Sequence, residues 1–181
     1  AADRSGEADF FLARFSNLHT FMPDQFRCGD KSRRLLEGQT IKVPLTTVSE
    51  FARGKRRLDL LRMDVEGFEV EVIDGMREAF ENDPSFGPII VFEAHFPKYD
   101  DAAHSMRERL RHLFERGYRV TALTSNDERR GQRFVELGYH PDRIVETSDT
   151  VSQGIYRDFR NEAAEKLICD LGGVRDVVLK R

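Results

Sequence analysis

The stretch LDLLRMDVEGFEVEVIDGM, residues 58–76, decides the fold of the chain. Its first part is mostly apolar and ends at Asp64, which predicts a buried strand, and Gly67 marks a sharp exit from it. From Phe68 to Phe80 the apolar residues recur at helical spacing, which predicts an amphipathic helix. The stretch therefore indicates a strand followed directly by a helix.

The same alternation continues downstream. Residues 88–94 (PIIVFEA) predict the next strand, apolar enough to be buried on both faces as parallel strands are. Residues 101–116 carry an apolar helical stripe, and residues 118–123 (YRVTAL) predict a further strand. This order predicts an α/β fold with a mostly parallel sheet joined by right-handed crossovers.

The flanking segments predict smaller elements. Residues 8–15 are aromatic-rich and predict a strand, residues 16–40 a long loop, and residues 41–45 a short strand. Thr47 is expected to cap a brief helix, with Glu50 as its capping-box partner.

Beyond residue 123 the pattern is less regular. It predicts helices over residues 130–137 and 163–171, a short strand over 144–146 and a strand over 174–179. No repeat or domain boundary is visible, so we expect one domain over residues 1–181, with 124–181 as its C-terminal extension.

Composition narrows the class of protein. The 181 residues carry a formal net charge of -3, which argues against a nucleic-acid-binding surface. Cys28 and Cys169 lie far apart, which fits neither a zinc site nor a disulfide framework and favours a cytoplasmic setting. No apolar run approaches the roughly 18 residues that cross a bilayer, so no membrane contact is expected.

Polar side chains directly follow two of the predicted strands. Asp64 and Glu66 follow the first strand, and Glu93 and His95 stand at the end of the next. Ligands bind outside the carboxyl ends of strands in open parallel sheets, so these four residues are candidates for a functional site. If the strands pair, three carboxylates and an imidazole would converge, a set that can position a divalent cation or deprotonate a hydroxyl.

Each of these residues also has a purely structural interpretation. Asp64 could cap the following helix, and Glu66 could favour its N-terminal dipole. Glu93 needs a partner at the end of an apolar strand, and a structural arginine would serve as well as a ligand. His95 alone could be a satisfied surface or core residue. The sequence also contains neither G-x-G-x-x-G nor a P-loop, so no complete nucleotide-binding half is visible.

Several segments resemble, in order, those of FkbM-type methyltransferases. Residues 58–76 resemble the central signature of the family, an apolar strand leading into Asp-x-Glu-Gly and a helix that ends in Gly. Residues 88–95 (PIIVFEAH) are similar to its next strand, which closes on Glu and often His. Similar upstream segments are residues 2–11 (ADRSGEADFF), Ser16-Asn17 with Thr20, and residues 46–51 (TTVSEF). Together the resemblance covers residues 2–123.

The resemblance implies a Rossmann-like methyltransferase fold and methyl transfer from S-adenosylmethionine to a hydroxyl group. In the family, a strand with a Gly-rich turn and a second strand with an acidic residue hold the cofactor. Both are expected upstream of Ala1, so this chain is expected to lack the N-terminal strands of the fold.

The resemblance also implies roles for individual residues. Asp3 would lie near the adenine ring, and Asn17 would reach the cofactor from the loop. Asp64 would face the methyl group, and His19 would contact the acceptor. The base would be Asp64 or His95, and no residue is assigned to a metal. The expected catalytic residues are Asp64, Glu66, Glu93 and His95.

Three functions are compatible with the sequence. The first is an O-methyltransferase of a small molecule or glycan that uses S-adenosylmethionine, with a divalent metal compatible but not indicated. The second is a non-catalytic half-domain that docks onto a partner chain, and the third is a metal-dependent hydrolase using the same carboxylates. A homo-oligomer is compatible with the sequence, and no nucleic-acid or membrane partner is expected.

Overall fold

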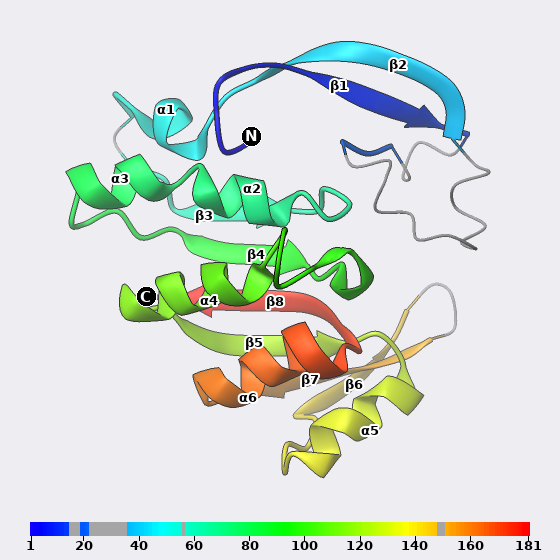
Figure 1. The fold of residues 1–181 in the computed structure, drawn as a ribbon. Coiled ribbons are helices and arrows are strands. Elements are labelled where there is room, and N and C mark those ends of the chain that lie inside the picture. The colour runs from blue at the N-terminus through cyan, green and yellow to red at the C-terminus, as the bar shows by residue number, and fades with distance from the viewer. Residues whose placement is uncertain (15–18, 22–35, 56, 148–150) are drawn as a thin grey trace. The chain divides into compact units, whose positions relative to one another are not determined.

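The computed structural model describes residues 1–14, 19–21, 36–55, 57–147 and 151–181 (Figure 1). The chain divides into two compact units, each built from two stretches of sequence. The first unit comprises Ala1–Leu58 and Asp64–Phe86, and the second comprises Asp59–Met63 and Gly87–Arg181. Among the described residues, no helix combines the length and apolarity that crossing a bilayer requires.

The first unit begins with a two-stranded antiparallel sheet. Strand β1 (Gly6–Ala13) pairs with β2 (Leu36–Leu45), with a register shift between Phe11 and Ala13. The strands predicted over residues 8–15 and 41–45 are confirmed. β2 is longer than predicted because it follows β1 along its whole length. Asn17 and most of the predicted loop lie outside the described residues.

The first helix, α1 (Val48–Ala52), begins as the sequence predicts. The Thr47 side chain accepts a hydrogen bond from the backbone N–H of Glu50, at 2.9 Å. The Glu50 carboxylate does not close a capping box and instead accepts from the hydroxyls of Ser5 and Thr46. These two hydrogen bonds lower the pKa of Glu50, with the one from Ser5 having the larger effect.

The single helix predicted from Phe68 to Phe80 is wrong, because two short helices stand there: α2 (Glu69–Asp74) and α3 (Arg77–Asn82). Ser49 causes the break. Its hydroxyl donates to the Gly75 carbonyl at 2.7 Å and accepts from the Ala79 N–H at 2.9 Å. In a continuous helix this carbonyl and this N–H would bond to each other.

A close approach of the chain requires the glycine at this break. A Cβ on Gly75 would lie only 2.1 Å from the Ala2 carbonyl oxygen, so no larger residue fits without a shift of the backbone. Ala2 itself is fully buried, and its N–H donates to the Thr46 carbonyl at 2.8 Å. Residues far apart in sequence thus meet around the α2–α3 junction.

The second unit is built on a six-stranded sheet in the order β3-β4-β8-β5-β7-β6. Only β3 and β4 pair in parallel, and the other four pairs are antiparallel. The expectation of a mostly parallel sheet is therefore wrong, although the α/β class is right. The strands are β3 (Leu60–Met63), β4 (Ile89–Glu93), β5 (Arg119–Ser125), β6 (Arg143–Glu146), β7 (Ser152–Arg157) and β8 (Val174–Lys180).

The position of β8 explains the error. β3, β4 and β5 run in the same direction, as the strand–helix alternation predicts. However, β8 inserts between β4 and β5 and runs against both, and the β6–β7 pair adds a hairpin beyond β5. The prediction that β4 is buried on both faces is also wrong, since Ile89 is 36% exposed.

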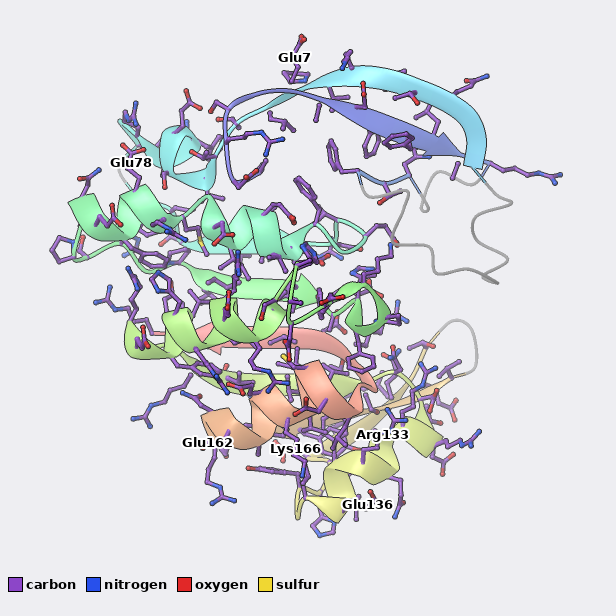
Figure 2. All side chains as sticks on the ribbon, in the orientation of Figure 1. Glu7, Glu78, Arg133, Glu136, Glu162 and Lys166 are labelled. Atoms are coloured by element: carbon purple, nitrogen blue, oxygen red, sulfur yellow. The ribbon has the colours of Figure 1, made fainter. Side chains whose placement is uncertain are left out.

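The described part of the second unit also contains the short 3-10 helix η4 (Phe96–Lys98) and three α-helices: α4 (Met106–Glu115), α5 (Glu128–Glu136) and α6 (Asn161–Lys166), which continues as the π-helical turn η5 (Leu167–Leu171). α4 and α6 lie on the same face of the sheet (Figure 1). Glu162 and Lys166 project outward from α6 (Figure 2), opposite the side chains that it buries. The fully buried core residues of the second unit include Phe92, Leu110, Leu113, Leu123, Leu167, Ile168, Val177 and Leu179.

Candidate functional site

The Asp64–Gly67 turn of the first unit has an unusual backbone. Glu66 has a φ of 54° and Gly67 a φ of 95°, so two consecutive residues adopt left-handed conformations. Asp64 is exposed, and Glu66 is half-buried. A non-glycine residue with positive φ is uncommon and costs free energy, so the surrounding structure must hold it in place.

A buried carboxylate holds this turn. Glu69, in the first turn of α2, is fully buried, and its Oε1 accepts from the N–H groups of Val65, at 3.2 Å, and Gly67, at 3.4 Å. Sequence reasoning missed Glu69 because a glutamate early in a helix reads as an exposed dipole partner. Its burial depends on the tertiary fold. Asp64 and Glu66 thus belong to a turn that the Glu69 carboxylate holds in place.

A run of aromatic rings connects the same turn with the hairpin. Phe68, directly after Gly67, stacks on Phe21 with ring centroids 4.7 Å apart. Phe21 contacts Phe10, and Phe10 meets the His19 ring edge-on. These contacts link the β1–β2 hairpin to the residue that follows the turn.

His19, the predicted acceptor contact, lies at the far end of this aromatic run. Its Nδ1 accepts a hydrogen bond from the Ala13 N–H at 2.9 Å, which fixes the ring and leaves Nε2 as the nitrogen that carries the proton in the neutral form. Whether His19 touches an acceptor stays a prediction.

Asp3, the predicted adenine contact, lies at a cavity of about 370 Å³ within the first unit. The cavity lies between α1 and the α2–α3 junction, and Asp74, Glu78 and Glu81 add three further carboxylates. Glu78 points from α3 toward α1 (Figure 2), where it pairs with Arg53 at 2.8 Å. The lining therefore offers many hydrogen-bond acceptors.

In the second unit, Glu93 is the last residue of β4. Its Oε1 lies 3.8 Å from Nε of Arg175 on the neighbouring strand β8. A structural arginine is thus one partner of this carboxylate, which was one of the two interpretations open from sequence. His95, two residues further, is half-buried, and its backbone N–H donates to the Tyr99 hydroxyl at 3.0 Å.

Two further polar residues stand at the same end of the sheet. Asp176 is opposite Glu93 in the β4–β8 register. Its Oδ2 accepts a hydrogen bond from the Thr124 hydroxyl at 2.7 Å. Its backbone N–H donates to the hydroxyl oxygen of Thr124 at 2.9 Å. Sequence reasoning missed this pair, because nothing in a single sequence shows that β8 lies next to β5.

The strand pairing explains how the two predicted groups relate along the chain. Met63 pairs with Phe92 in the parallel β3–β4 ladder, so the chain leaves both strands at the same edge of the sheet. Asp64 is the next residue after Met63, and Glu93 the next after Phe92. Asp64 and Glu66 belong to the first unit and Glu93 and His95 to the second, and the convergence of all four stays a prediction.

Comparison with known proteins identifies the family. A model of the methyltransferase FkbM domain matches residues 5–120. This range contains the Asp64–Gly67 turn, β3, β4, Glu93 and His95, and it ends within β5. No curated protein and no solved structure matches the chain. The match covers more than half of the 181 residues, and the chain belongs to the methyltransferase FkbM family.

Proposed function

We propose that the chain transfers a methyl group from S-adenosylmethionine to a hydroxyl group of a small molecule or glycan. The observation that carries the proposal is the fixed Asp64–Gly67 turn, which follows a strand whose parallel neighbour ends in Glu93. Both lie within the match to the methyltransferase family. That match gives no support to a hydrolase or to a non-catalytic docking domain.

The residues of the first unit suit parts of this cofactor. The carboxylates at the Asp3 cavity are acceptors for an adenine amino group or ribose hydroxyls, and Arg77 adds a donor to the same lining. We therefore keep Asp3 as the proposed adenine contact. When bound, S-adenosylmethionine supplies a methyl group on a positively charged sulfur, which departs as a neutral thioether.

The chain's own task is to orient the acceptor and to take its proton. We assign the proton to Asp64 or His95, because both follow strand ends and both side chains can accept one. Glu66 and Glu93 would orient the hydroxyl by accepting hydrogen bonds. In-line methyl transfer needs no covalent enzyme intermediate, so positioning supplies most of the rate enhancement. We also propose a cytoplasmic setting, since two cysteines far apart in sequence do not suggest a disulfide framework.

A calorimetric titration of the protein in its full length with S-adenosylhomocysteine tests the proposal. We expect one-to-one binding, together with transfer of a labelled methyl group from S-adenosylmethionine to a hydroxylated acceptor in a panel of glycosides. If the titration shows no binding and the assay gives no labelled product, the proposal is wrong. Asp64→Asn should reduce transfer by about 10²–10⁴-fold if Asp64 is the base, with little change in S-adenosylhomocysteine affinity. Asp59→Asn, just before β3 begins, is the matched control.

A further inference from the structure

A second cavity, of about 230 Å³, lies in the second unit. Its lining comes from the end of β5, from α5, and from β6 and β7, all beyond the residues that the family model matches. Figure 1 shows α5 beside β6 and β7 at one end of the six-stranded sheet. No role in the proposed reaction has been assigned to any of these residues.

The floor of this cavity is closely packed around one aromatic ring. Tyr156 is 3% exposed, and its hydroxyl donates to the Gly131 carbonyl at 3.4 Å. A Cβ on Gly154 would lie 2.6 Å from the Tyr156 ring, and a Cβ on Gly131 would lie 2.8 Å from its hydroxyl. Ser125 is fully buried, and its hydroxyl accepts from the Gly154 N–H at 2.9 Å. The floor is therefore rigid and carries two hydroxyl groups.

The walls combine apolar and neutral polar groups. Val135, Pro141 and Ile144 form the apolar part, and Ile144 is 63% exposed although it is a large aliphatic residue. Gln132 and Ser152 add an amide and a hydroxyl, and Glu128 adds a carboxylate. In the part of the chain that the structure describes, no lysine or arginine lines the cavity, which disfavours an anionic ligand.

This combination fits a sugar ring. One face of a sugar is a layer of C–H groups that packs on aliphatic side chains, and its hydroxyls bond to amide, hydroxyl and carboxylate groups. Pockets that enclose a drug-sized ligand measure about 300–1,000 Å³, so a cavity of about 230 Å³ has room for a single ring.

The cavity also lies at the edge of the sheet where β4 ends in Glu93. β4 and β5 both pair antiparallel with β8, so they run in the same direction, and Ser125 ends β5 at the edge where Glu93 ends β4. The two strands are separated by two strand spacings, or about 10 Å. The cavity extends from β5 to β7 and β6, which lie one and two spacings further from β4. A ring in the cavity would therefore lie about 10–20 Å, or a few sugar units, from the strand end that carries Glu93.

We propose that this cavity binds one sugar ring of a glycan acceptor, a few sugar units away from the sugar whose hydroxyl is methylated. The proposal rests on the proposed methyl transfer for its biological meaning. The binding itself does not depend on the cofactor, because every lining residue belongs to the second unit.

Nuclear magnetic resonance titration of the ¹⁵N-labelled chain tests the proposal. The probes are neutral methyl glycosides of glucose, mannose and rhamnose, with glucuronic acid as the anionic comparison and methylammonium as the cationic one. We expect saturable shifts of the amides of Gly131, Gln132, Ile144 and Gly154 with at least one neutral glycoside. Ile144→Trp, which fills the cavity from an exposed position, should weaken this binding at least about tenfold.

Leu60→Trp is the matched control, because Leu60 is also an exposed aliphatic residue on an edge strand of the same sheet and should leave binding unchanged. The absence of saturable shifts, equal effects of the two tryptophans, or binding of the charged probes alone would overturn the proposal. Sugar binding without S-adenosylhomocysteine binding would sink the methyl transfer and leave the sugar site. Cofactor binding without sugar binding would overturn the sugar site and leave the proposed methyl transfer in place.

Discussion

Glu69 is a carboxylate with no exposed surface that accepts from two backbone N–H groups of the Asp64–Gly67 turn. Replacing it with alanine leaves both donors without this acceptor, and the Gly67 donor belongs to a buried residue. We expect Glu69→Ala to lower the free energy of unfolding by about 1–3 kcal/mol, measured by urea denaturation. Glu69→Gln keeps an acceptor oxygen and should lose less.

The control for Glu69 is Glu81→Ala, at an exposed position near the end of α3. It should change the free energy of unfolding by no more than about 0.5 kcal/mol. An equal loss in Glu69→Ala and Glu81→Ala would show that the buried carboxylate does not hold the turn.

The Cys169 thiol illustrates how burial controls reactivity. Desolvation raises its pKa to about 12. In a Cys28→Ser background at pH 8, iodoacetamide should therefore alkylate Cys169 at least about a hundredfold more slowly than a free thiol. The rate should still rise about tenfold per pH unit between pH 8 and pH 10. A rate that levels off near pH 9 would contradict the raised pKa, and urea-unfolded chain provides the reference rate.

The candidate residues could be found from sequence only where polarity breaks an apolar run. Asp64, Glu66, Glu93 and His95 satisfy this condition, which is why the strand ends could be located. Residues whose role comes from tertiary contacts give no such signal, as Glu69, Thr124 and Asp176 show.

At the scale of elements, an ion-pair network joins α4 to the α6–η5 segment. Glu165 on α6 accepts from Arg107 at 2.8 Å and from Arg111 at 2.8–2.9 Å, and Arg107 also pairs with Asp101 and Asp170. The Glu165 side chain is only 13% exposed. This network therefore fixes two helices that lie on the same face of the sheet.

The hydrogen bond from Arg111, which is the largest effect, and the one from Arg107 lower the pKa of Glu165 below its ordinary value of 4.5, although partial burial acts in the opposite direction. The folded state thus binds the proton less readily than the unfolded state does. The stabilisation is complete above the ordinary value and is lost as the pH falls below it through the lowered pKa. We expect Glu165→Gln to lose about 2 kcal/mol at pH 7, and this difference from the parent chain should shrink in acid.

Glu162→Gln is the control for Glu165, because Glu162 lies on the same helix and points outward (Figure 2). It should change the free energy of unfolding little at any pH. Urea denaturation at several pH values measures both variants, and a Glu165→Gln loss that does not depend on pH would contradict the lowered pKa.

Local signals in the sequence were sufficient to predict most helices and strands, but they did not predict where an element is broken. Thr47 caps α1 as predicted, because a cap is made within four residues. The break between α2 and α3 depends on Ser49, a residue about 26 positions away, whose hydroxyl replaces a helical hydrogen bond. The strand β7 was missed because Gly154 interrupts the alternation of apolar and polar side chains that predicts a strand. A glycine stands there because a larger residue would collide with the Tyr156 ring.

At the scale of the whole molecule, the sheet of the second unit depends on β8. This strand lies between β4 and β5 and carries the fully buried Val177 and Leu179. Deleting residues 174–181 should abolish cooperative unfolding of the second unit, followed by near-ultraviolet circular dichroism, although this strand lies outside the family match. Deleting Arg181 alone should preserve the transition. A truncated chain that still unfolds cooperatively would contradict this role of β8.

The strand at residues 174–179 could be predicted, but its place in the sheet could not. Apolar alternation shows that a strand forms, whereas its neighbours depend on pairing between distant residues. The α/β class was therefore recoverable from the sequence, and the mostly antiparallel pairing was not.

The central place of β8 also has a consequence for synthesis on the ribosome. β4 and β5 emerge before β8, so the edge of each strand that pairs with β8 has no permanent neighbour until Val174–Lys180 has left the exit tunnel. At about 5–20 residues per second, the edges of β4 and β5 wait for several seconds. During that interval they offer unpaired backbone groups to other nascent chains, so the second unit is the part of the protein that would gain most from a chaperone.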